Sequence, residues 1–230
     1  MATSSGPPTI ITDRLVFTAD AGNTRCYIPG ESTGTDLIGD TTLTLNNQTT
    51  ISGTNSWLFD GTDDSITSTT GPALSASASL SCWFNPSSYG NYESIISSRN
   101  YYTAAKNNNW AIQVMADYRI VTAFCNGTSI DRAFTSHADL TGTWNYLVVT
   151  TEGTTPAKTY VNNVLISTLT LNEGQTNPMD DISNGTTFGS DISQGNDFNG
   201  FIGGVLFYNK TLSTSEMLQN YNSQKARFGL

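Results

Sequence analysis

The sequence has few charged residues, and cations are the scarcer kind. Only 13% of its 230 residues are charged, and 10 Lys and Arg stand against 19 Asp and Glu, which gives a formal net charge of -9. Binding to nucleic acid needs a basic stripe that displaces counterions from the phosphates, and an anionic membrane surface attracts the same kind of stripe. The composition therefore predicts neither nucleic acid nor membrane as a partner.

Cysteine is also scarce, and long apolar runs are missing. Cys26, Cys82 and Cys125 are odd in number and far apart, so they fit neither a disulfide framework nor the spacing of metal ligands. Residues 1–13 lack the basic start and apolar run of a secretory signal, and no later run reaches membrane-spanning length. These features predict buried free thiols and synthesis in a cytoplasm.

Thr, Ser, Asn and Gly are abundant, a composition that favours short strands joined by many turns over helical bundles. The densest strand signal is residues 143–168, TWNYLVVTTEGTTPAKTYVNNVLIST, in which three β-rich runs are separated by two turns. Asn162 and Asn163 form the second turn, since Asn tolerates the left-handed conformation of a two-residue hairpin. The pattern predicts an all-β chain with three antiparallel strands here.

The first of these strands has two apolar faces. Tyr146 and Val148 point to one side, and Leu147 and Val149 point to the other. We therefore expect it to be a central strand of a layered structure.

Further strands are predicted along the rest of the chain. They fall at residues 15–18, 43–45, 56–66 (two short strands around a turn), 78–85, 95–98, 110–115, 120–125, 187–189 and 200–209. Gly203 and Gly204 in the last strand indicate a bulge or a close approach of another backbone. Residues 1–9 are expected to form an arm, and residues 10–230 one sandwich domain.

One helix is predicted at the end of the chain, over residues 214–227. Ser213 and Glu216 have the spacing of a capping box, and Met217, Leu218 and Tyr221 form a short apolar face. We expect this helix to pack on an edge of the sandwich.

The order of several separated segments resembles that of the laminin-G-like, concanavalin A-like sandwich domains, particularly those found in structural proteins of tailed bacteriophages. The segments are LVFTADAGN (15–23), FDGTDD (59–64), SLSCWF (79–84), TWNY (143–146), YVNNV (160–164), FNGFIG (198–203) and YNKTLS (208–213). The resemblance implies a jelly roll of two antiparallel sheets.

Hydrolases exist on this sandwich, but the sequence argues against an enzyme. Glycoside cleavage needs two carboxylates across the scissile bond, and the five glutamates are isolated, with no E-x-D-x-E strand. His137 has no nucleophile motif beside it. We expect no catalytic residues and no required cofactor.

Asp60, Asp63 and Asp64 offer hard oxygen ligands, which suit Ca²⁺. Asp and Gly are also what a tight turn between strands selects, so a structural turn is the alternative interpretation. Weaker candidates for calcium are Asp180, Asp181, Asp191 and Asp197.

Aromatic residues near asparagines suggest a surface that recognises sugar or a partner. The candidates are Tyr89, Tyr92, Tyr101, Tyr102 and Trp110. The alternative is that these rings pack beneath a long loop or form a subunit contact, where tyrosine is common.

These observations lead to a non-enzymatic virion structural protein: a capsid decoration or fibre-associated module, made in the host cytoplasm and displayed on a phage particle. Its expected partners are other virion proteins, and a homo-oligomer is compatible with the sequence. The alternative is a carbohydrate-binding module that attaches a virion to a host surface glycan. A polysaccharide hydrolase with an unrecognised site is a third hypothesis.

Overall fold

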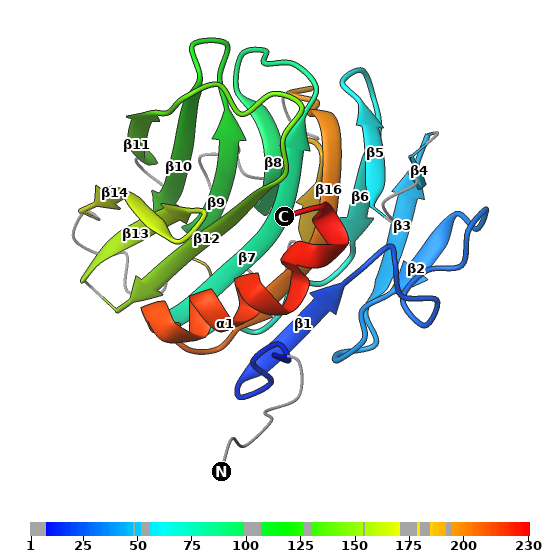
Figure 1. Ribbon diagram of the computed structural model, residues 1–230, viewed down its shortest axis with the longest axis horizontal. Helices are drawn as coiled ribbons and strands as arrows, with labels where there is room; N and C mark the ends of the chain where they lie inside the picture. The colour runs from blue at the N-terminus through cyan, green and yellow to red at the C-terminus, as the bar shows by residue number, and fades with distance from the viewer. Residues whose placement is uncertain are drawn as a thin grey trace.

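The computed structural model is a sandwich of two antiparallel sheets, with one helix across the outer face of one sheet (Figure 1). The structure describes residues 8–47, 49–51, 56–98, 107–126, 130–153, 155–170, 179, 185–191 and 195–230, apart from the side chains of residues 107, 108 and 126. The predicted fold class is confirmed.

The helix-side sheet has eight strands, in the order β14-β13-β12-β7-β16-β5-β4, with β1 also paired to β16. Their bounds are β1 Leu15–Ala19, β4 Thr50–Ile51, β5 Trp57–Asp60, β7 Ser77–Pro86, β12 Asn145–Glu152, β13 Thr155–Val161, β14 Val164–Leu169 and β16 Asn199–Tyr208.

The opposite sheet also has eight strands, in the order β11-β10-β9-β8-β15-β6-β3-β2. Their bounds are β2 Thr33–Thr35, β3 Thr42–Asn46, β6 Ser65–Ser68, β8 Glu93–Ser98, β9 Asn107–Val114, β10 Arg119–Asn126, β11 Ile130–Ser136 and β15 Thr186–Phe188. Strands β2 and β4 lie at one side of the sandwich, and β11 and β14 lie at the other (Figure 1).

Strand β12 is central, as predicted, and its two apolar faces serve two separate apolar layers. Leu147 and Val149 lie in the core between the sheets, whereas Tyr146 and Val148 lie on the outer face beneath the helix. All four side chains are fully buried. Since the side chains of a strand alternate, one strand contributes to both layers.

The predicted hairpin after β13 is also confirmed. Asn162 and Asn163 have φ angles of 50° and 67°, and β13 and β14 pair antiparallel on either side of them. Both asparagines therefore hold the left-handed conformation that a two-residue turn requires.

The helix α1 (Thr214–Gln224) continues into a 3-10 turn, η1 (Lys225–Phe228). Ser213 and Glu216 form the predicted capping box. The expected position at a sandwich edge is wrong: Trp83 of β7 stacks on Tyr221 and Phe228, with ring centroids 5.3 and 4.6 Å apart. Trp83 of β7 and Tyr146 and Val148 of β12 lie on the outer face of this sheet, and the helical layer packs against them.

Leu218 does not belong to the buried face of α1, contrary to expectation. It is 48% exposed, while Met217 and Asn220 are the buried residues of the helix. The amide of Asn220 donates to the Tyr208 hydroxyl (3.0 Å), and its Oδ1 accepts from the Ile11 N–H (2.7 Å). The described start of the chain is thereby tied to the last helix.

The glycine pair in β16 lies at a bulge, one of the two predicted alternatives, and the group that approaches it closely is a side-chain ring and not another backbone. The register of β16 against β7 shifts between Gly203 and Leu206, which is a bulge. A Cβ at Gly203 would lie 2.6 Å from the Phe228 ring, so the helical layer approaches the backbone here.

Strands β2, β4 and β11 were not predicted. The first two contain three and two residues, too few for a periodic pattern. In β11, Asp131 and Arg132 interrupt the apolar alternation. The dipeptide Asn126-Gly127 predicts a hairpin turn, and Gly127 lies outside the described residues.

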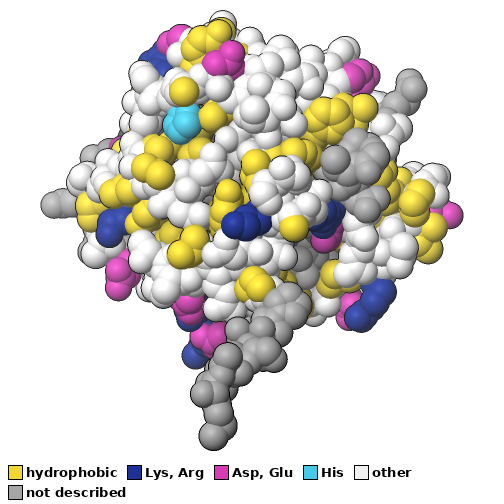
Figure 2. Space-filling model, in the orientation of Figure 1, with side chains coloured by type: hydrophobic (Ala, Val, Ile, Leu, Met, Phe, Trp, Pro, Cys, Tyr) yellow, Lys and Arg dark blue, Asp and Glu magenta, His cyan; other side chains and the backbone are white. Residues whose placement is uncertain are grey.

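No described helix has the length and apolar character needed to cross a membrane. On the face seen in Figure 2, the Lys and Arg side chains are dispersed and form no stripe.

Candidate functional site

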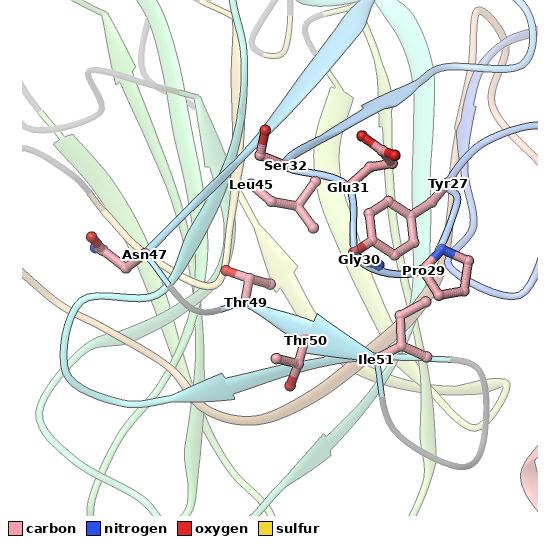
Figure 3. Close-up of a pocket in the computed structure, with 10 residues that line it drawn as sticks. All are labelled: Tyr27, Pro29, Gly30, Glu31, Ser32, Leu45, Asn47, Thr49, Thr50 and Ile51. Carbon is pink, nitrogen blue, oxygen red and sulfur yellow. Dashed lines mark hydrogen bonds between the residues drawn. The ribbon is translucent and has the colours of Figure 1, made fainter.

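A cleft opens at the side of the sandwich where β4 ends the helix-side sheet and β2 and β3 end the opposite sheet (Figure 3). We call it the edge cleft. Its cavity volume is about 440 Å³, and the lining residues are Tyr27, Pro29, Gly30, Glu31, Ser32, Leu45, Asn47, Thr49, Thr50 and Ile51.

The edge cleft combines an apolar wall with polar groups. Tyr27, Pro29 and Ile51 lie on one side of the view in Figure 3, and Asn47 lies at the opposite end. The Tyr27 hydroxyl accepts a hydrogen bond from the Gly30 N–H (3.3 Å). Gly30 has a φ of 94°, a conformation that favours glycine and turns the loop back toward β2.

Asn47 forms the turn at the other end of the edge cleft. It follows β3 with a left-handed φ of 58°, which Asn tolerates better than most residues. Its amide donates to the Asp63 carbonyl, and the Thr49 hydroxyl donates to the Asn46 carbonyl (2.9 Å). These hydrogen bonds hold the polar side chains of the edge cleft in place in the protein alone.

A second cleft adjoins the first, and Asn47 lines both. We call it the polar cleft. It has a cavity volume of about 410 Å³ and is lined by Asn46, Asn47, Asp63, Ser65, Thr67, Ser190, Gly195 and Asp197.

Hydrogen bonds hold the side chains of the polar cleft in place. The Asn46 amide donates to the hydroxyls of Ser65 (3.1 Å) and Thr67 (3.3 Å), and the Ser190 hydroxyl donates to Asp197 Oδ1 (2.6 Å). Three segments distant in sequence, residues 46–47, 63–67 and 190–197, thus form one polar surface.

The structure brings the predicted calcium candidates together. One carboxylate oxygen from each of Asp60, Asp63 and Asp64 lies within 4.8 Å of the others, with Asp64 buried and the other two exposed. This spacing suits the oxygen ligands of Ca²⁺. The turn interpretation also fits, because Asp60 Oδ1 accepts from the Thr62 N–H (2.8 Å). Calcium binding stays a prediction.

Two further carboxylates lie near this cluster. Burial raises the pKa of Asp197, and the charges of Asp63 and Asp60 raise it further. Burial also raises the pKa of Glu93, with a contribution from Asp197. These acids come from separate loops and strands, so their proximity could not be predicted from the sequence.

The rings of Tyr89, Tyr92, Tyr118 and Phe134 form a second candidate region, which we call the aromatic surface. Tyr89 meets Tyr118 edge to face at 5.2 Å, and Tyr92 meets Phe134 in the same way at 6.4 Å. The sequence indicated Tyr89 and Tyr92, and their partners come from the loop before β10 and from β11.

Arginines cover part of the aromatic surface. The Arg119 guanidinium lies 5.0 Å from the centre of the Phe134 ring, and that of Arg132 lies 6.0 Å from the centre of the Tyr92 ring. The Tyr89 hydroxyl accepts from the Leu140 N–H (3.0 Å), and burial raises the pKa of Tyr89 to about 12.

Trp110 is not part of any exposed surface, contrary to expectation. It is 2% exposed and packs in the core, with its ring 5.8 Å from that of Phe207. Its position in β9 points it between the sheets, opposite Phe124 in the register with β10. Tyr101 and Tyr102 lie outside the described residues.

The geometry defines a two-sheet β-sandwich with clefts at one side. The chain belongs to the concanavalin A-like lectin/glucanases superfamily, in its laminin G form, whose family model matches residues 60–217. A comparison with curated proteins found no match.

Solved structures with the same fold include two kinds of domain. Domain 4 of AbnA, a GH43 extracellular arabinanase from Geobacillus stearothermophilus in complex with arabinotriose, has a TM-score of 0.66 at 15% identity, covering 92% of this chain and 98% of that domain. The botulinum neurotoxin type G receptor binding domain has a TM-score of 0.69 at 14% identity. The match covers 92% of this chain but 52% of the toxin domain, so this chain spans about half its length.

Proposed function

We propose that this protein is a non-catalytic carbohydrate-binding domain that holds a sugar in the edge cleft. The observation that carries the proposal is the lining of that cleft. Tyr27, Leu45 and Ile51 supply an apolar wall, and Asn47 and Thr50 supply hydrogen-bonding groups. Ligand pockets commonly combine apolar walls with a few placed polar groups, and a sugar ring presents both C–H faces and hydroxyls.

The neighbours of this fold support binding as the role. Domain 4 of the arabinanase was solved with arabinotriose, and the toxin domain is named for receptor binding. At 15% identity or less, these likenesses show the fold, so the site and the ligand of this chain rest on its own clefts.

The edge cleft lacks the pair of acids that glycoside cleavage uses. Among the ten lining residues that Figure 3 draws, Glu31 is the one carboxylate. The His137 Nδ1 lies 3.2 Å from the carbonyl oxygen of the next residue, Ala138, so the imidazole contacts the backbone of its own loop. These features favour binding without chemistry.

A glycan array tests the proposal with a matched pair of variants. Thr50→Val removes an exposed hydroxyl from β4 in the edge cleft, and Thr168→Val makes the same change in β14, at the other side of the same sheet. We expect a glycan signal that falls about tenfold with Thr50→Val, the value of one hydrogen bond, and stays unchanged with Thr168→Val. Silence of the wild-type protein on the array would overturn the proposal.

The second proposal concerns where the domain works. We propose that it is displayed on a phage particle as a capsid decoration or fibre-associated module, after synthesis in the host cytoplasm. Its partners there would be other virion proteins or a second copy of itself. The order of the motifs from residue 15 to residue 213 supports this location. The described N-terminal segment lies beside α1, where Asn220 Oδ1 accepts a hydrogen bond from the Ile11 N–H.

Mass spectrometry of purified virions tests this location. We expect the protein among the virion components, and we expect the purified protein to bind capsids that lack it. Its absence from virions together with no binding to such capsids would contradict the second proposal and leave the first one intact.

A further inference from the structure

We infer that the sugar site continues from the edge cleft into the polar cleft, and that the extended site takes a neutral oligosaccharide and rejects chains of uronic acids. This inference rests on the proposed function. It adds a second subsite and a class of ligand.

The two clefts are close enough to serve one ligand because Asn47 lines both of them. The hydrogen bond from the Asn47 amide to the Asp63 carbonyl joins the turn after β3 to the loop before β6. Volumes of about 440 and 410 Å³ lie in the lower part of the ~300–1,000 Å³ range of ligand pockets. A short oligosaccharide would therefore occupy both clefts.

The polar cleft has the groups of a sugar subsite without an apolar wall. Its described lining consists of Asn, Ser, Thr, Asp and Gly. Thr67 and Ser65 are held by the Asn46 amide, and Ser190 is held by Asp197. Because these groups are already oriented, a sugar loses little free energy in ordering them.

Charge decides which class of sugar fits. None of the described residues that line either cleft is Lys, Arg or His, whereas Glu31, Asp63 and Asp197 are carboxylates. Asp60 and Asp64 stand beside Asp63, and the whole chain carries a formal net charge of -9. In calcium-free buffer a uronate would enter this negative region without a cation to receive it, so repulsion should exclude it. A neutral sugar meets no such cost.

An array of matched oligosaccharides tests both parts of the inference, the second subsite and the preference for neutral sugars. It carries neutral arabino-, gluco- and galacto-oligosaccharides of three and six units, and oligogalacturonides of the same lengths. We expect neutral hexasaccharides to bind at least tenfold more tightly than neutral trisaccharides, and oligogalacturonides to bind at least tenfold more weakly than neutral chains. Stronger binding of oligogalacturonides would overturn the inference and leave the proposed function standing. If no glycan binds, both fail.

Variants in each cleft separate the two parts further. Thr67→Val in the polar cleft should reduce hexasaccharide binding to the trisaccharide level and leave trisaccharide binding unchanged, and equal losses for both lengths would remove the second subsite. Glu31→Gln combined with Asp63→Asn, two exposed side chains, should raise binding of oligogalacturonides severalfold at low salt. Glu152→Gln at the exposed end of β12 changes net charge without touching either cleft and should have no such effect. An unchanged preference in the double variant would overturn the electrostatic part.

Discussion

The edge cleft and the aromatic surface differ in what their side chains contact. At the aromatic surface, the four rings pack edge to face, and guanidinium groups lie over Phe134 and Tyr92. At the edge cleft, one ring and several aliphatic and polar side chains surround a cavity of about 440 Å³. A sugar site needs accessible space as well as aromatic residues, and the edge cleft has that space. The edge cleft therefore fits a sugar better than the aromatic surface does.

The two regions also differ in charge. The aromatic surface contains Arg119, which pairs with Asp117 at 2.7 Å, and Arg132. The clefts contain carboxylates and no base among their described lining residues. The same fold thus offers an acidic side with cavities and a side where cations and rings pack together.

The largest expected effect is that of a substitution that unfolds the whole domain and so removes both the edge cleft and the aromatic surface. Val148 is fully buried beneath the helix, so Val148→Asp would place an unpaired charge there and cost roughly 4 kcal/mol or more. Near-UV circular dichroism should show the loss of the fixed aromatic environment. A folded, soluble Val148→Asp protein would show that this layer is misassigned.

Trp110→Ala should destabilise the protein by about 3–5 kcal/mol, because it opens a cavity in the core. Urea unfolding measures the loss, and Trp110→Phe serves as the milder control. A variant that keeps wild-type stability but loses glycan binding would instead place Trp110 in a binding surface.

Calcium should act at the acidic side and leave the aromatic surface unchanged. If Asp60, Asp63 and Asp64 bind Ca²⁺, a concentration 100-fold above the Kd would add about 2.7 kcal/mol of stability. Differential scanning fluorimetry with CaCl₂ and with MgCl₂ measures this. An Asp63→Asn variant that keeps the full response to calcium would contradict this site.

Phe134→Ala should cost about 1 kcal/mol, because it removes a half-exposed ring pair and an arginine contact. Glycan binding should stay at the wild-type level in this variant. Loss of binding without further loss of stability would move the sugar site to the aromatic surface.

The smallest effect is expected for Asp197→Asn. The pKa of Asp197 is raised in the fold, so its charged form destabilises the protein above that pKa, and the cost disappears as the pH falls to the ordinary value of 3.8. The variant keeps an acceptor for Ser190, and at pH 7 it should be more stable than wild type by less than about 1 kcal/mol. Thermal unfolding at pH 7 and pH 3 should show a gain at the higher pH alone. A gain of equal size at both pH values would exclude the charge as its cause.

The sequence predicted the parts of the fold that depend on local chemistry. The turn at Asn162 and Asn163 and the capping box at Ser213 follow from side chains that favour one backbone conformation. The position of the helix did not follow, because its partners Trp83 and Tyr146 come from strands far away in the chain.

The clefts could not be predicted from the sequence for a similar reason. The edge cleft joins a loop after Tyr27, the turn after β3 and the two-residue β4, and the loop, the turn and β4 have no periodic pattern. Asn47 alone carried a weak signal, as a residue that tolerates a left-handed turn. The aromatic candidates were conspicuous in sequence, yet Trp110 is a core residue.

Chemical-shift mapping of the amide NMR spectrum tests the central claim most directly. The protein would be titrated with the strongest neutral oligosaccharide from the array. We predict the largest shifts at Glu31, Asn47 and Thr50, with those at Tyr92 and Phe134 unchanged. Large shifts at Tyr92 and Phe134, with none in the edge cleft, would contradict the account.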